Sequence, residues 1–151
     1  RSVSRGLGDV YKRQTQWSPD LIYFNNREVK PTTGYCVQKL YGQNAGSHYI
    51  PSQIILDNQD NRVKLRIGSS IVRDSKTGDV IVKLVNLLPV SVETEIQLPG
   101  IGSVQPSAVR TVLAGAPEST PLPVTDTIEV GVNFKQQLPA YSFTVIRLKT
   151  K

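Results

Sequence analysis

The sequence predicts a mainly β fold, an antiparallel β-sandwich or jelly roll preceded by a single β/α unit. From about Tyr49 onward, apolar and polar residues alternate in several short stretches, which is typical of strands with one face on a core and the other in water. Turn residues separate these stretches into about seven or eight strands, as in sandwiches and jelly rolls. Before Tyr49, a continuous apolar run is followed by a helical pattern.

Residues 15–46 are expected to form a strand, a loop and a helix. The run LIYF at 21–24 is continuous and apolar, as in a strand buried on both faces of an α/β sheet or barrel. Two asparagines end it, and the sequence PTT at 31–33 starts a helix with a threonine hydroxyl as its cap. Val37, Leu40 and Tyr41 form the core-facing stripe of this helix, and either Gly42 or Gly46 can close it.

Residues 47–151 carry the alternating patterns. The clearest lie at 63–67, 90–98 and 128–134, and each predicts a half-buried strand. Turn and loop signals are a hairpin loop at 74–79, a Pro-Gly turn at 99–100 and a Pro-rich surface loop at 115–123.

Residues 1–14, RSVSRGLGDVYKRQ, differ from the rest of the chain. They hold four basic residues and one acid, without alternation or a helical stripe, and no apolar run that would make a secretory signal follows them. A basic arm for nucleic acid or membrane and a disordered tail both fit this composition. The string also resembles translated sequencing adaptor at the end of a fragmentary reading frame. We therefore expect a non-native or disordered, dispensable leader, with the native sequence starting near Thr15.

The charge balance bounds the class of partner. The chain has 18 Lys and Arg against 12 Asp and Glu, and without residues 1–14 the balance is 14 against 11. The remaining basic residues are scattered, which argues against a nucleic-acid partner. No stretch approaches the ~18 consecutive apolar residues of a membrane helix, so no membrane partner is expected.

Few residues have the chemistry of a catalytic or metal site. His48 is the only histidine, which excludes a His-rich metal site and leaves a Ser-His-acid triad unsupported. Cys36 is also alone and lies on the helical stripe, where we expect a buried apolar side chain and no disulfide. Glu93 and Glu95 share the polar face of a predicted strand and should point into solvent, where burial does not raise their pKa. We therefore expect no catalytic residue, no metal and no cofactor.

The stretch WSPDLIYFNN holds the best candidates for substrate contact. Trp17 and Asp20 precede the apolar run, and residues at strand ends contact ligands in barrel enzymes. Trp17 offers a flat face for a sugar ring, and the carboxylate of Asp20 can accept hydrogen bonds from hydroxyls. It is equally consistent with the sequence that Trp17 packs in a core and that Asp20 caps a turn.

Four segments resemble the C-terminal part of the α-L-arabinofuranosidases of glycoside hydrolase family fifty-one. In chain order they are WSPDLIYFNN, VKPTTGYCVQKLYGQNAG, VKLVNLLPVSVETEIQLPGIG and LPAYSFTVIRLK. The similarity runs from about Gln16 to Lys149. Cys36 and Tyr41 stand where the family's helix has a second aromatic residue and a Phe-like residue, and both are packing changes.

The resemblance implies a retaining glycosidase that removes terminal α-L-arabinofuranosyl groups from arabinan, arabinoxylan and arabinogalactan. Its two catalytic glutamates precede WSPDLIYFNN in the family order, so this chain would carry neither. Residues 15–46 would be the last β/α unit of a (β/α)₈ barrel and residues 47–151 a C-terminal sandwich packed on that barrel. A periplasmic or extracellular location in a bacterium is favoured.

One alternative stays open. A free-standing carbohydrate-binding or structural β-sandwich would have the same strand pattern. A carbohydrate-binding module should display aromatic residues on one sheet face or loop. Tyr141 and Phe143 share one parity, whereas Tyr35, Tyr41 and Tyr49 belong to the helix and the segment after it, which predicts no obvious platform.

Overall fold

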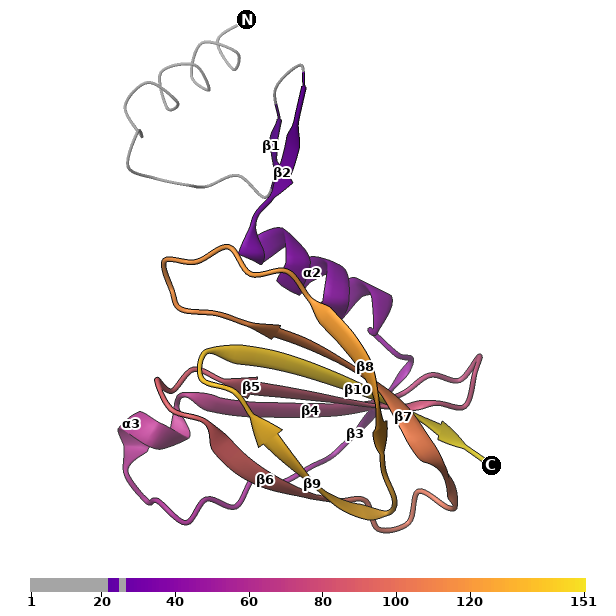
Figure 1. Cartoon of the computed structure of the whole chain (residues 1–151). Helices are drawn as coiled ribbons and strands as arrows, with labels where there is room; N and C mark the ends of the chain where they lie inside the picture. Colours follow the sequence, from indigo (N-terminus) through magenta and orange to yellow (C-terminus); the bar gives the residue numbers. More distant parts are fainter. Residues whose placement is uncertain (1–21, 25–26) are drawn as a thin grey trace, which may run out of the picture.

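The computed structural model describes residues 22–24 and 27–151 (Figure 1). The described part is mainly β, as predicted, with one long helix. The expectations for residues 1–14 concern residues outside the described part. The elements are β1 (Ile22–Phe24), β2 (Val29–Pro31), α2 (Thr33–Gln43), β3 (His48–Ile50), α3 (Asn61–Lys64), β4 (Ile67–Arg73), β5 (Val80–Asn86), β6 (Val92–Gln97), β7 (Val104–Ala114), β8 (Val124–Glu129), β9 (Asn133–Leu138) and β10 (Ser142–Thr150).

Two antiparallel sheets of unequal size form the sandwich. The large sheet has six strands in the order β3-β4-β5-β10-β7-β8, and the small sheet is the two-stranded ribbon β6-β9. Alternation along β5 and β10 directs one set of side chains toward the ribbon and the other toward α2. The large sheet is therefore covered by the ribbon on one face and by the helix on the other (Figure 1).

Each covered face has its own apolar core. The core under the ribbon is centred on β5 and β10, with Val82 and Ile146 almost fully buried, and Ile96 and Leu138 close it from the ribbon. The core under α2 contains Cys36 and Leu40 of the helix together with Val72, Ile81, Leu113, Phe143 and Val145 of the sheet. The prediction that Cys36 is a buried apolar residue is confirmed.

The helix begins where the sequence predicted. Thr32 is its N-cap and accepts a hydrogen bond from the backbone N–H of Tyr35 (3.3 Å). Of the predicted stripe, Leu40 is buried and Val37 is partly buried, whereas Tyr41 is 41% exposed. Asn44, not a glycine, is the C-cap, and its side chain also donates to the carbonyl of Leu40.

The strand at 22–24 forms, but its surroundings differ from the expectation. β1 pairs antiparallel with β2, a strand that the pattern did not predict, and Ile22 is 38% exposed. Figure 1 shows this hairpin projecting from α2, away from the two sheets. Burial of this strand on both faces, which the apolar run predicts for a strand among others in a barrel, stays a prediction.

Two of the alternating patterns were wrong about their boundaries. At 63–67 the structure has the short helix α3, because Asp60 accepts the backbone N–H of Arg62 (2.8 Å) and caps a helical turn; Leu65 is 84% exposed. At 128–134 the chain passes from β8 in the large sheet to β9 in the ribbon. Ile128, Val130 and Phe134 all pack on the same core, so the alternation continues through the corner between two strands.

Candidate functional site

The two residues predicted to contact substrate lie outside the described part of the chain. Trp17 and Asp20 both precede Ile22, the residue at which the description starts. Their role therefore stays a prediction.

The carboxylate pair on β6 points into solvent, as predicted. Glu93 and Glu95 are exposed, Glu93 accepts a hydrogen bond from Lys135 Nζ (3.1 Å), and Glu95 accepts one from Gln97 Nε2 (3.1 Å). The hydrogen bond to Glu93 raises the pKa of Lys135. A general acid for glycoside hydrolysis needs a desolvated carboxyl group, and this surface supplies none.

Among the residues that the structure describes, His48, the single histidine, belongs to no catalytic constellation. His48 is exposed on the edge strand β3, and its Nδ1 lies 2.9 Å from Ser47 Oγ. The Ser47 hydroxyl also donates a hydrogen bond to the backbone carbonyl of Arg73 and accepts one from the backbone N–H of Ser75. Within the residues that the structure describes, no three His, Cys, Asp or Glu side chains come together as a possible metal site.

An apolar groove of about 420 Å³ lies between α2, the loop after β7 and the start of β10. Its lining includes Val37, Tyr41, Leu113, Pro117, Tyr141 and Phe143. Tyr41 stacks on Phe143 with ring centroids 4.7 Å apart and an angle of 5° between the planes. The sequence pattern missed this pair because its members come from a helix and a strand far apart in the chain. Phe143 is buried, so the stack exposes one ring and does not make a broad sugar platform.

Two unusual residues border this groove, and neither had a sequence signal. Lys83 is only 4% exposed, its Nζ lies 5.1 Å from the ring centroid of Tyr41, and burial lowers its pKa. Tyr141 has a φ of 48°, in the left-handed region, where its N–H donates to Leu88 and its carbonyl accepts from Gly115. The groove therefore has a fixed aromatic rim, and its lining contains no acidic residue to act as a catalytic base.

A polar cluster around Arg147 anchors the C-terminal end of α2. Arg147 Nη1 lies 3.0 Å from Asp79 Oδ2 and 3.7 Å from Asp74 Oδ2, and Nη2 donates to Asn44 Oδ1 (3.3 Å). The backbone N–H of Lys76 lowers the pKa of Asp74, with a further contribution from the charge of Arg147. The cluster joins α2 to β10 and to the β4-β5 hairpin, a structural role.

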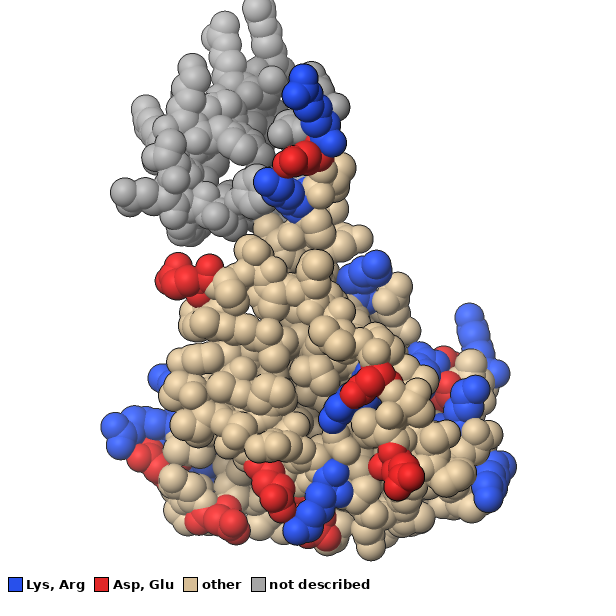
Figure 2. Space-filling view, viewed as in Figure 1, with Lys and Arg blue, Asp and Glu red and all other residues tan. Residues whose placement is uncertain are grey.

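The described surface carries charged side chains of both signs. Figure 2 shows basic and acidic side chains interspersed on the face it presents, with a broad area between them that carries few charges. An ion pair joins Arg110 of β7 to Asp126 of β8, and the hydrogen bond from Arg110 lowers the pKa of Asp126. No helix in the described residues is long and apolar enough to cross a membrane.

Comparison with known proteins gives a consistent set of relatives, although no family model matches the chain. An arabinose-bound α-L-arabinofuranosidase of glycoside hydrolase family fifty-one is 30% identical, with a TM-score of 0.76 over 93% of this chain and 23% of that chain. An arabinose complex of the α-L-arabinofuranosidase from Thermotoga maritima has a TM-score of 0.68 at 14% identity, over 83% of this chain and 30% of its own.

The sequence comparison finds a relative of the same kind. An extracellular exo-α-L-arabinofuranosidase from Streptomyces chartreusis is 47% identical over 38 residues, which are 25% of this chain and 5% of that protein. This chain therefore spans less than a third of the length of each of these relatives.

Proposed function

Because this chain belongs to the α-L-arabinofuranosidases of glycoside hydrolase family fifty-one, we propose that it serves as the C-terminal, non-catalytic part of a retaining enzyme of that family. The observation that carries the proposal is the match over 93% of this chain at 30% identity. The antiparallel sandwich without an acid/base pair in its described residues supports an accessory role.

The proposal assigns a different role to each of the two parts of the chain. Residues 47–151 are the accessory sandwich, and residues 15–46 are the last β/α unit of the barrel that carries the catalytic glutamates. The whole enzyme removes terminal α-L-arabinofuranosyl groups from arabinan or arabinoxylan and acts outside the cytoplasm. The extracellular relative and the arabinose bound to the solved relative of 30% identity support this location and substrate class.

The chain by itself is expected not to hydrolyse an aryl α-L-arabinofuranoside. A retaining mechanism needs two carboxyl groups about 5–5.5 Å apart around one anomeric carbon, one as nucleophile and one as acid/base. Glu93 and Glu95 are solvated and hydrogen-bonded to neighbours instead. The measurement is release of the aryl alcohol against a buffer blank, with a complete enzyme of the family as positive control. Turnover that disappears in Glu93→Gln or Glu95→Gln would contradict the proposal.

Within the complete enzyme, Asp20→Asn is expected to lower kcat/KM by about 10- to 100-fold. Asp20 follows Pro19, whose fixed φ favours a defined loop, and precedes the strand at 22–24. We propose that its carboxylate accepts hydrogen bonds from furanose hydroxyls at the barrel mouth. A charge-assisted hydrogen bond of this kind contributes roughly 1.5–3 kcal/mol, which corresponds to that loss.

The matched control is Asp57→Asn, since Asp57 is exposed and its side chain has no partner among the described residues. It should change neither kcat/KM nor Tm. Both quantities are measured for both variants. If Asp20→Asn lowers Tm and leaves kcat/KM unchanged, Asp20 holds its loop and does not bind substrate.

A further inference from the structure

The large sheet ends in an edge strand that carries none of the usual protection against further pairing. β8 (Val124–Glu129) is the last strand of the order β3-β4-β5-β10-β7-β8, and among the described strands it pairs with β7 alone. Five of its six residues are exposed, and the sixth, Ile128, is half-buried. Natural proteins protect such edges with lysine, proline or a β-bulge. The sequence VTDTIE contains neither lysine nor proline, and the register of β8 with β7 runs without a bulge.

The backbone of β8 has hydrogen-bonding groups that face away from β7. Val130 N–H donates to the carbonyl of Pro106 (2.9 Å), so Val130 is one of the residues that are hydrogen-bonded to β7. Because hydrogen-bonded and non-hydrogen-bonded pairs alternate along an antiparallel ladder, every second residue before it has its N–H and C=O groups turned outward. These residues are Thr125, Thr127 and Glu129. Their outward groups have no backbone partner among the described residues.

We propose that β8 pairs antiparallel with β8 of a second copy of this chain, about a two-fold axis at Thr127, so that the two large sheets become one continuous sheet. In this register each Thr127 lies opposite its counterpart, and each Thr125 lies opposite Glu129 of the other copy. All three outward N–H groups of one strand then donate to outward carbonyls of the other. A two-fold contact is self-complementary and closed, so the product is a dimer and not a fibre.

The charges on β8 favour this register over those with the axis at Asp126 or Glu129. An axis at Asp126 would place that carboxylate directly opposite its counterpart, and an axis at Glu129 would do the same for the glutamate. Like charges directly opposite one another destabilise a sheet. With the axis at Thr127, Asp126 lies opposite Ile128 and Glu129 lies opposite a threonine. Arg110 of the same copy forms an ion pair with Asp126, which offsets its charge.

Hydrogen bonding and apolar contact favour the same register. An axis two residues earlier would place outward groups opposite Pro121 and Pro123, which have no N–H to donate. The axis at Thr127 instead places Val124 opposite Val130 of the other copy. Val124 is 67% exposed in the single chain, so this pair removes apolar surface from water at both ends of the contact.

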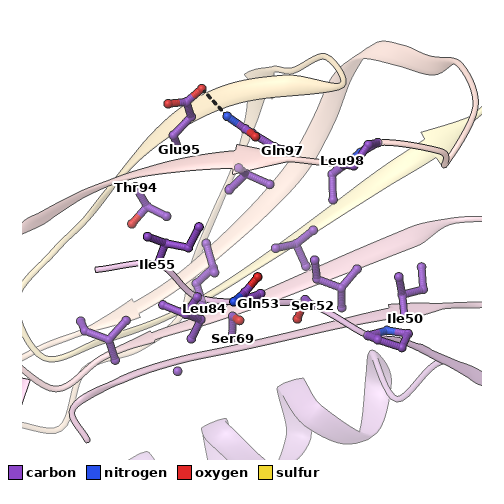
Figure 3. A pocket seen from close by; sticks show the side chains of 18 of the residues that line it. Ile50, Ser52, Gln53, Ile55, Ser69, Leu84, Thr94, Glu95, Gln97 and Leu98 are labelled. Atoms are coloured by element: carbon purple, nitrogen blue, oxygen red, sulfur yellow. Dashed lines mark hydrogen bonds between the residues drawn. The ribbon is translucent and has the colours of Figure 1, made fainter. Parts of the chain in front are cut away.

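The edge of β6 is less open to a second copy. It borders a cavity of about 320 Å³, whose opposite wall is made by residues 50–55 of the same chain. Figure 3 shows Gln53 and Ile55 across this cavity from Glu95 and Gln97. A strand of a second copy would have to enter between these two walls to reach β6. β8 lies at the outside of its sheet with exposed side chains on both faces, so it is the better surface for self-association.

The test uses the chain itself and needs no arabinofuranosidase activity. Thr127→Cys and Thr125→Cys each place one exposed thiol on the same face of β8, and mass spectrometry follows disulfide-linked dimers in a glutathione buffer. In the proposed register the Cα atoms of the two positions 127 lie about 5.5 Å apart, within the range of a disulfide. The two positions 125 are displaced by four residues, roughly 13 Å along the strands, which is beyond that range.

Thr127→Cys should therefore form the linked dimer at least about tenfold faster than the matched control Thr125→Cys, because pairing raises the effective concentration of one thiol near the other. Cys36 is buried and is present in both variants, so it does not contribute to the difference.

A second set of variants tests the backbone pairing. Thr127→Pro removes one outward N–H and leaves the hydrogen bonds to β7 in place, so Tm should hold within about 2 °C while the dissociation constant of the dimer rises at least about tenfold. Sedimentation equilibrium between about 20 μM and about 1 mM covers the affinity expected of a small interface. Thr127→Val keeps the N–H and the side-chain shape, so it should associate like the unaltered chain. Should Thr127→Pro fail to fold, Thr127→Lys, which places two like charges at the axis, should weaken the dimer to the same extent.

Three results would overturn the proposal. The first is a chain that stays monomeric up to about 1 mM. The second is an equal rate of disulfide formation in the two cysteine variants. The third is self-association that neither Thr127→Pro nor Thr127→Lys weakens, which would place the contact between copies on another surface.

Discussion

Asn86→Ala is expected to lower the free energy of unfolding by about 3–5 kcal/mol, which corresponds to a fall in Tm on the order of 10 °C. Asn86 ends β5 and is fully buried. Its Nδ2 donates to the carbonyls of Val90 (2.9 Å), Leu138 (3.3 Å) and Pro139 (2.8 Å), and its Oδ1 accepts the N–H of Leu88 (3.0 Å).

The size of this effect comes from the groups that the mutation leaves behind. Alanine removes both the donor and the acceptor, so backbone groups in two different loops lose their partner in a buried region. An unsatisfied buried polar group costs about 1–3 kcal/mol, more than the net gain from an average hydrogen bond. Asn86 joins the loop before β6 to the connection between β9 and β10, so these two connections should loosen together.

Asn86→Asp tests whether the hydrogen bonds that Nδ2 of Asn86 donates are the ones that stabilise the fold. Aspartate has the same shape, but its carboxylate faces the carbonyls of Leu138 and Pro139 and cannot donate to them. Burial and these carbonyls should raise its folded-state pKa, so the variant should be more stable at pH 5 than at pH 7 relative to the unaltered chain. Asn133→Ala, at an exposed strand end, is the control and should change stability by less than about 0.5 kcal/mol. Thermal unfolding gives Tm, and urea unfolding gives the free energy of unfolding. Equal losses of stability in Asn86→Ala and Asn133→Ala would contradict the structural role of Asn86.

Local patterns predicted most of the strands but not how they are shared between sheets. The alternation at 92–97 gave β6 and its outward glutamates correctly, because one face of that ribbon packs on a core. The alternation at 128–134 continues across the corner between β8 and β9, because residues on both sides of that corner pack on the same core. The pattern at 63–67 failed because a single cap, Asp60, favours a helical turn over a strand. Periodicity records which residues face a core, not which partner strand they have.

The candidate site was less predictable than the fold. The aromatic stack of Tyr41 on Phe143 and the buried Lys83 depend on α2 crossing the sheet, and no local pattern records that crossing. The left-handed backbone of Tyr141 has no sequence signal either, since such positions usually hold glycine or asparagine. The outward direction of Glu93 and Glu95 on β6, by contrast, followed from their parity alone.

Leu40→Ala is expected to lower the free energy of unfolding by about 2–4 kcal/mol, and to do so for the helix and the sandwich together. Leu40 is 7% exposed and packs in the core that α2 shares with Val72, Ile81 and Phe143 of the large sheet. Alanine has the higher helix propensity, so the loss comes from the cavity and the lost apolar burial rather than from the helix itself. Because Arg147 of β10 also donates to Asn44 at the end of α2 and to Asp79, helix and sheet should unfold in one transition.

The control for this last variant is Lys39→Ala, one residue earlier on the exposed side of α2, which should leave Tm within about 2 °C. Far-ultraviolet circular dichroism follows the helix during heating, and hydrogen exchange of the backbone amides of β5 and β10 follows the sheet. A single transition shifted by Leu40→Ala would mean that the helix assigned to the barrel folds as part of the sandwich in this chain. Early loss of the helical signal with an unchanged sheet transition would contradict that coupling. It would also make the sandwich of residues 47–151 the independent folding unit, because the sheet would then keep its stability without the apolar cover that Cys36 and Leu40 provide.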